Sequence, residues 1–216
     1  LKSTNKNGRT ILSLACRQRQ TEVVKLLLRH SVTENMNLNV SPVDIIDVFK
    51  WACKKGNGEI VQMLVDQYAI HIKSYIPNAF RLACEYGHKD VAKVLLDHSS
   101  TNIDLNAKDF YGYTAFMLPC KNGHKDVVHM LLNHSAHNID LNAKATCGET
   151  PFMMACVNGH KDVVQLLLDH SNSKIDLKAR TPNGRTAFIL ACNRGHIDVV
   201  KLLLDHSNSN IDLNTR

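Results

Sequence analysis

The sequence predicts an all-α-dominated repeat solenoid, with stacked helix-turn-helix units joined by β-hairpin fingers, and three observations support this fold class. A motif around Gly112 returns around Gly148 and Gly184, which gives a period of 36 residues. Apolar residues within each copy recur at helical spacing. The aromatic content of 6% is low, which fits a core built from Leu, Val, Ala and Cys.

More diverged copies of the motif precede these three. They are anchored by Ala-Cys pairs at 15–16, 52–53 and 83–84. We therefore expect one array over residues 1–216, with approximate units 1–43, 44–75, 76–108, 109–144, 145–180 and 181–216.

The copy at 148–180 illustrates the elements of one unit. Residues 151–157 carry apolar side chains at helical spacing, and Gly159 can supply the left-handed residue that ends a helix. A second helix starts at residues 160–162, where Asp162 is favourable near the positive end of the helix dipole, and it ends at the polar stretch 169–174. Residues 175–184 alternate and turn as a hairpin finger does.

This order of elements resembles the ankyrin repeat. The residues that carry the resemblance stand where that family has Gly-Xaa-Thr-Pro-Leu: Gly112-Tyr113-Thr114-Ala115-Phe116, Gly148-Glu149-Thr150-Pro151-Phe152 and Gly184-Arg185-Thr186-Ala187-Phe188. The Asn-Gly-His and Val-Val-Xaa-Leu-Leu runs also match. The family period is about 33 residues, so we expect a longer, outward-facing loop at 171–174 and at its counterparts near 99–102 and 135–138.

Four departures from the family pattern lead to specific expectations. Met117, Met153 and Ile189 replace a family histidine, which predicts apolar packing between neighbouring units. Pro119 replaces an Ala of the sister copies and is expected to remove a hydrogen bond and kink the first helix. The second unit lacks the Gly-Xaa-Thr entrance at residues 44–49, so an irregular or shortened finger is expected, with uncertain boundaries between 33 and 50. The last unit has no polar cap, Leu1 is not a start methionine and residues 211–216 read as the approach to another finger, so a fragment of a longer protein is expected.

The net charge of +6 is concentrated in residues 1–43, where seven Lys or Arg residues stand against two acids. The later units are neutral or nearly so, which argues against a continuous basic groove along a nucleic-acid backbone. Binding of RNA or DNA by the basic first unit stays open as an alternative. A partner with an acidic segment near the first repeat is the expectation that we draw from this charge.

Cysteine usage and hydropathy indicate the compartment. Five cysteines follow an Ala in the same local context and are expected to be buried and reduced: Cys16, Cys53, Cys84, Cys156 and Cys192. The sequence shows no secretory signal and no apolar run of about 20 residues. We therefore expect an intracellular protein, cytoplasmic or nuclear, without membrane insertion.

Neither a metal site nor a catalytic centre is predicted. One histidine series stands at equivalent positions in successive units, one per unit, whereas zinc needs three or four converging ligands: His88, His124, His160 and His196. We interpret these residues as structural, and a second series ends the second helices: His30, His98, His134, His170 and His206. The residual metal candidates are His129, His134 and His137. No cofactor is expected, because no phosphate loop, paired carboxylates or nucleophile–base arrangement is found. Cys147, in a finger turn, is either exposed and oxidisable or a simple turn substitution.

The remaining candidate site is a surface that varies between units on a constant frame. The resemblance implies that fingers and first helices form a concave face, where a partner protein or peptide binds. The residues that we expect to line it are Arg17, Lys54, Lys55, Glu85, Tyr86, Phe110, Tyr111, Tyr113, Lys121, Asn122, Glu149, Val157, Asn158, Arg185, Asn193 and Arg194.

The three aromatic residues at one finger turn, 110–113, are the sharpest feature of this surface. Tyrosine is over-represented among the residues that dominate interface energies. We predict a binding hot spot shared with Tyr86 and flanked by Lys121; the alternative is that two of the rings pack on adjacent fingers. Trp51 is expected in the core.

The predicted function is that of a non-catalytic, monomeric protein-interaction scaffold. The alternative from another class is the recognition arm of a larger enzyme, channel or transcriptional regulator. The identity of the partner does not follow from the fold class, since one fold hosts many functions.

Overall fold

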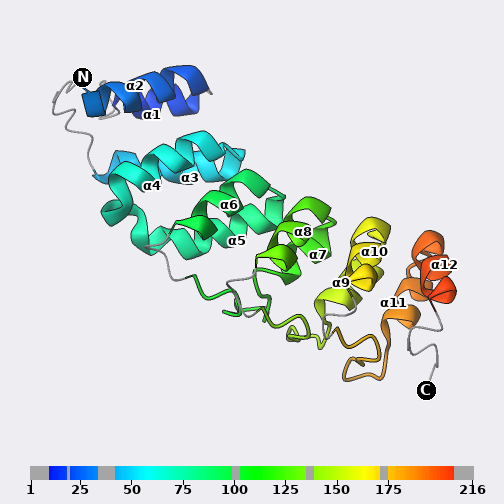
Figure 1. The fold of residues 1–216 in the computed structure, drawn as a ribbon. Helices are drawn as coiled ribbons and strands as arrows, with labels where there is room; N and C mark the ends of the chain where they lie inside the picture. Colours follow the sequence, from blue (N-terminus) through cyan, green and yellow to red (C-terminus); the bar gives the residue numbers. More distant parts are fainter. Residues whose placement is uncertain are drawn as a thin grey trace. The chain divides into compact units, whose positions relative to one another are not determined.

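The computed structural model describes residues 10–18, 20–33, 42–98, 103–134, 139–170 and 175–206. The chain divides into two compact parts, each larger than a single repeat. From here on, unit 1 means Leu1–Ala83 with Asp90–Ile103, and unit 2 means Cys84–Lys89 with Asp104–Arg216. The helices, labelled in Figure 1, are α1 (Ile11–Arg17), α2 (Thr21–Thr33), α3 (Pro42–Lys55), α4 (Gly58–Ile72), α5 (Ile76–Tyr86), α6 (Lys89–Asp97), α7 (Met117–Asn122), α8 (Lys125–Asn133), α9 (Pro151–Val157), α10 (Lys161–Asp169), α11 (Ala187–Asn193) and α12 (Ile197–Asp205).

In unit 1, α1 packs against α2 and α3, and both α2 and α3 pack against α4. The apolar side of α3 is buried through Ile45, Val48, Phe49, Ala52 and Cys53. Trp51 is only partly buried, because it lies beside this stripe and not within it.

The end of α4 is irregular. Its backbone leaves helical geometry at Tyr68 (φ −129°, ψ 24°), and a 3-10 turn, Lys73–Tyr75, then leads directly into α5 without a finger. Residues 34–41 of the predicted irregular region between 33 and 50 lie outside the described residues, and α3 is regular from Pro42 onward. A proline suits that first helical position, since its missing N–H would have no partner there.

In unit 2, the helix pairs α7–α8, α9–α10 and α11–α12 follow one another (Figure 1). The first helix of each pair packs against the first helix of the next, α7 on α9 and α9 on α11, and the second helices α8, α10 and α12 do the same. The bounds of α9 and α10 confirm the two helices predicted for the copy at 148–180. Thr150 caps α9, since its Oγ1 accepts a hydrogen bond from Met153 N at 3.3 Å.

The fingers of unit 2 are turns. In the first finger, Asp109 N donates to Tyr113 O at 3.0 Å. Equivalent hydrogen bonds close the next two fingers, from Ala145 N to Glu149 O and from Thr181 N to Arg185 O, both at 3.0 Å. No β-strand is found in the described ranges, so the β-hairpin part of the prediction is not confirmed. A single backbone hydrogen bond of this kind in each finger does not make the ladder of hydrogen bonds that pairs two β-strands. The predicted longer loops at 99–102, 135–138 and 171–174 lie outside the described residues.

The predicted kink at Pro119 is wrong. Helix α7 begins at Met117, two residues later than the position equivalent to the start of α9. Pro119 therefore lies in the first turn, where an N–H has no partner within the helix and none is lost. The proline shortens the helix at its start and does not bend it.

Apolar packing at the positions of the family histidine is confirmed for Met117 and Met153, which are 0% and 1% exposed. Met117 packs with Ala143, Ala145 and Met154 in one cluster.

The expectation of five buried cysteines is wrong for Cys192. Cys16, Cys53, Cys84 and Cys156 are buried as predicted, but Cys192 is exposed. The physical reason is its position in the last described helix pair. Cys156 is covered because α11 packs on α9, and no further described helix packs on α11 in the same way. Leu204 is 46% exposed for the same reason, whereas the equivalent Leu168 is 4% exposed.

Candidate partner-binding surface

The finger turn at 109–113 is held by its own backbone and by one carboxylate. Asp109 Oδ1 accepts hydrogen bonds from the backbone N–H groups of Tyr111 and Tyr113, both at 2.9 Å. Gly112 takes a positive φ of 76°, which a residue with a Cβ adopts only with strain. The turn is therefore fixed before any partner arrives.

This turn presents two of its three aromatic rings to solvent. Phe110 is 92% exposed and Tyr111 is 62% exposed, and their ring centroids lie 5.5 Å apart in an edge-to-face arrangement. Tyr113 is partly buried and packs on the Met117 cluster. The alternative that the rings pack within the protein therefore applies to Tyr113, whereas Phe110 and Tyr111 are exposed, as a binding hot spot requires.

Lys121 flanks the turn as predicted. Its Nζ lies 4.5 Å from the centroid of the Tyr113 ring and 3.4 Å from the Tyr113 hydroxyl. A cation over an aromatic face gains electrostatic energy from the ring quadrupole. Tyr86, the other residue of the predicted hot spot, is 53% exposed, and its ring lies 6.2 Å from that of His88.

Neighbouring fingers are joined to each other. The Tyr111 carbonyl accepts hydrogen bonds from both Thr146 N at 3.1 Å and Thr146 Oγ1 at 2.9 Å. A Cβ on Gly112 would lie 2.8 Å from Thr146 N, so glycine is needed for this close approach. The exposed Cys147 follows on the second finger.

The first histidine series connects successive repeats, in agreement with its structural interpretation. The Nε2–H groups of His124, His160 and His196 donate to the carbonyls of Glu85, Lys121 and Val157 at 2.9, 2.8 and 2.9 Å. Each imidazole thus satisfies a carbonyl near the C-terminal end of the preceding first helix, where intrahelical donors run out.

Two predicted contact residues use their amides within the protein. Asn122 Nδ2 donates to the Glu85 carbonyl at 2.8 Å, and Asn158 Nδ2 donates to the Met154 carbonyl at 2.8 Å. Both side chains remain exposed, as are Arg185, Asn193 and Arg194. Glu85, Glu149 and Val157 are partly buried.

In unit 1, Arg17 ends α1 and Lys54 and Lys55 end α3, and all three are exposed. Sequence reasoning missed Lys50, which lies on the exposed side of α3 with its Nζ 4.6 Å from the Tyr75 ring centroid. Its spacing of four residues from Lys54 was the signal that could have identified it.

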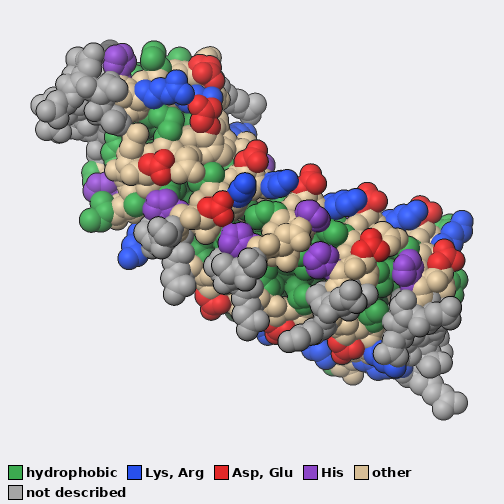
Figure 2. Space-filling model, viewed as in Figure 1, with side chains coloured by type: hydrophobic (Ala, Val, Ile, Leu, Met, Phe, Trp, Pro, Cys, Tyr) green, Lys and Arg blue, Asp and Glu red, His purple; other side chains and the backbone are tan. Residues whose placement is uncertain are grey.

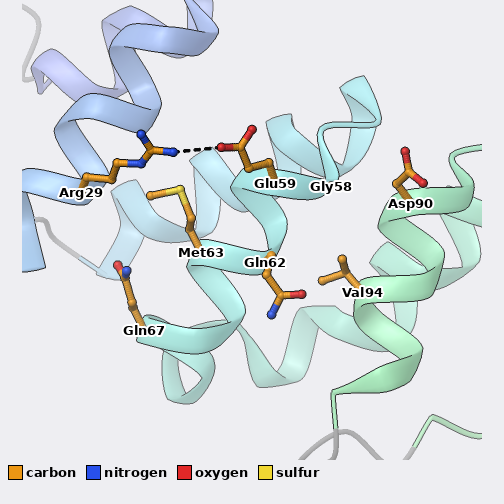
Figure 3. Close-up of a pocket in the computed structure, with 8 residues that line it drawn as sticks. All are labelled: Arg29, Gly58, Glu59, Gln62, Met63, Gln67, Asp90 and Val94. Atoms are coloured by element: carbon orange, nitrogen blue, oxygen red, sulfur yellow. Dashed lines mark hydrogen bonds and ion pairs between the residues drawn. The ribbon is translucent and has the colours of Figure 1, made fainter.

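A second feature of unit 1 that sequence reasoning missed is an open pocket of about 660 Å³ among the second helices (Figure 3). Its lining residues are Arg29, Gly58, Glu59, Gln62, Met63, Gln67, Asp90 and Val94. Gly58 allows the close approach of α6, since a Cβ there would lie 2.9 Å from Asp90 Cβ. The polar groups that line the pocket include the Arg29–Glu59 ion pair at 3.1 Å.

The buried thiols are poor nucleophiles. Burial raises the pKa of Cys53 to about 12, and burial together with the negative charge of Asp47 raises that of Cys16 to about 12. Burial also raises the pKa values of Cys84, Cys120 and Cys156. Since the thiolate is the reactive form, these side chains serve packing.

The described part of the chain contains neither a metal-binding cluster nor a membrane-spanning helix. No three His, Cys, Asp or Glu side chains gather there as a metal site requires, and His137 lies outside it. Each helix in these ranges is too short or too polar to cross a lipid bilayer.

Comparison with known proteins identifies the repeat. No curated protein matches the chain. A family model described as ankyrin repeats in three copies matches residues 1–76, 49–145 and 135–216. The matches extend from one end of the sequence to the other, and the helix pairs of unit 2 stack as the repeat requires. The chain therefore belongs to the ankyrin-repeat family.

Proposed function

We propose that the chain is a non-catalytic scaffold that binds a partner protein or peptide along the face formed by fingers and first helices. Ankyrin repeats are generally protein-interaction modules and are typically non-catalytic. The face itself is our inference, and the described residues of unit 2 support it.

The exposed ring pair of Phe110 and Tyr111 carries this proposal. Large aromatic side chains that are exposed at 92% and 62% bury much apolar area when a partner covers them. The Tyr111 backbone is held in place, since its N–H donates to Asp109 and its carbonyl accepts from Thr146, so little conformational entropy is lost on binding.

The opposite side of unit 2 supports the choice of face. Along its second helices, basic and acidic side chains stand side by side (Figure 2), as in the exposed pairs Lys125–Asp126 of α8 and Lys161–Asp162 of α10. Interspersed charges of both signs are typical of a solvated surface. Residues 110–113 of the first finger carry no charged side chain and expose aromatic area instead.

Site-specific photocrosslinking tests the proposed face. A photoreactive phenylalanine derivative is placed at Tyr111, on the finger, or at His129, which is exposed on the second helix α8. We expect a protein from cell lysate to be crosslinked from position 111 and not from position 129. Crosslinking from position 129 alone would show that the partner binds the second-helix side.

Truncation of the rings tests the hot spot with the captured partner in purified form. Loss of a hot-spot side chain costs about 2 kcal/mol or more, so we expect Phe110→Ala/Tyr111→Ala to weaken binding about 30-fold. His129→Ala serves as the control and should bind as the unchanged protein does. Equal affinities for all three proteins in calorimetry would refute the aromatic hot spot.

A further inference from the structure

The positive charge of the first repeat is not available on α2. Lys25 pairs with Glu22 at 3.1 Å and with Glu59, and Arg29 pairs with Glu59 at 3.1 Å. The pairing with Glu59 and Glu22 raises the pKa of Lys25, and the pairing with Lys25 lowers the pKa of Glu59. Cations that already face carboxylates add little to the attraction of an external anion.

The exposed side of α3 carries a second group of cations. Asp47, Lys50 and Lys54 are spaced three and four residues apart, so they share one stripe of the helix, and Lys55 adjoins it. The opposite side of α3 is buried in the core. This stripe is therefore the solvent side of a first helix.

Helix α1 extends the group, because α1 packs against α3 and ends at the exposed Arg17. Lys50 is positioned by its contact with the Tyr75 ring. We name the four cations Arg17, Lys50, Lys54 and Lys55 the basic stripe. It lies on first helices, the elements that the proposed function assigns to partner binding.

We propose that the basic stripe binds an acidic peptide segment of the partner, an inference that rests on the proposed function. Charge complementarity is the reason: four exposed cations stand on two adjoining first helices, with Asp47 the one exposed acid on α3. The stripe thus combines Arg17 of the first repeat with Lys50, Lys54 and Lys55 of the second, and it attracts the partner through α1 and α3.

An acidic peptide fits this stripe better than a nucleic acid does. Asp47 interrupts the cations, and Asp44 lies one turn before it on the same helix. A phosphate backbone carries a charge at every nucleotide and would meet these carboxylates, whereas a peptide can place neutral residues opposite them.

Fluorescence anisotropy with a labelled Glu-rich peptide of about 12 residues tests the proposal, with single-stranded DNA of similar length as the second probe. The test variant is Lys50→Glu/Lys54→Glu. The matched control is Lys89→Glu/Lys93→Glu, which makes the same change in net charge at exposed positions of the second helix α6. We expect the test variant to bind the peptide about tenfold or more weakly, the control to bind within about twofold of the unchanged protein, and added salt to weaken binding.

Three results would overturn the proposal: peptide affinity unchanged in the test variant, an equal loss in the control, or tighter binding of the DNA than of the peptide. Its failure is distinguishable from that of the proposed function. If crosslinking from position 111 and the ring-truncation effect persist while the charge variants change nothing, only the basic stripe is refuted. If crosslinking occurs only from position 129, the proposed face itself fails.

Discussion

Three glycines of unit 2 each share their space with the histidine of the following repeat. A Cβ on Gly87, Gly123 or Gly159 would lie 2.5 Å from Nδ1 of His124, His160 or His196. Each glycine also takes a positive φ between 75° and 79°. The Gly-His pairs therefore depend on one another across repeats, because the ring that bonds the preceding helix end occupies the space beside the glycine.

Alanine substitution of Gly195 and of Gly159 separates the cost of backbone strain from the cost of the steric clash. Gly195 has a φ of 71° and no described atom within 4 Å of its Cβ position, so Gly195→Ala should cost only the left-handed penalty of about 1–2 kcal/mol. We expect Gly159→Ala to cost at least about 1 kcal/mol more, since the His196 ring must move. Urea unfolding of both variants measures the difference. Equal losses would mean that the ring shifts at no cost.

At the scale of the element, the finger turn depends on one carboxylate. Asp109→Ala removes the acceptor of two backbone hydrogen bonds, so we expect about 1–2 kcal/mol lower stability and faster amide exchange at Tyr111 and Tyr113. Asp109→Asn keeps an oxygen at that place and should restore most of the protection, because Asn also accepts in such turns. Exchange rates that stay low in the alanine variant would show that the finger is held by its neighbours alone.

We expect stability to respond differently to proline at matching positions of the first helices α7 and α9. Pro119→Ala should change stability by less than about 0.5 kcal/mol, because Pro119 lies in the first turn and removes no hydrogen bond. Ala155→Pro places proline at the matching position of α9, where the helix has already begun at Pro151, and should cost about 3 kcal/mol or more. Thermal unfolding followed by circular dichroism compares the two. A large gain from Pro119→Ala would mean that α7 is strained.

At the scale of the whole molecule, the buried thiols link stability to alkaline pH. An exposed thiol titrates near its ordinary pKa of 9.0, and burial raises the pKa of Cys53 to about 12. The folded state therefore binds the proton more tightly, so this stabilisation is complete below pH 9 and is lost as the pH rises toward 12.

We expect the urea midpoint to fall between about pH 9 and pH 11, and to fall less steeply in Cys53→Ala/Cys156→Ala, which lacks two of the buried thiols. Cys147→Ala is the control, since that side chain is exposed. A slope that is the same in the double variant and in the control would exclude the buried thiols as the cause.

Several features of the fold followed from local patterns. The helices α9 and α10 and the structural role of the His124 series depend on local spacing and on the 36-residue repetition. Contact between equivalent positions of adjacent repeats is implied by that repetition itself. The exposure of Phe110 and Tyr111 was in part predictable, because a turn leaves side chains little to pack against.

By itself, the sequence determined the repeat family, the helix pairs and the burial of most Ala-Cys positions, since each arises from short-range spacing repeated along the chain. Only the tertiary structure decided the exposure of Cys192, the packing of Tyr113 and the pairing of Lys25 and Arg29 with Glu59. The physical reason is that these depend on which surface a neighbouring element covers and on where long side chains reach, and neither is encoded in the spacing within one repeat.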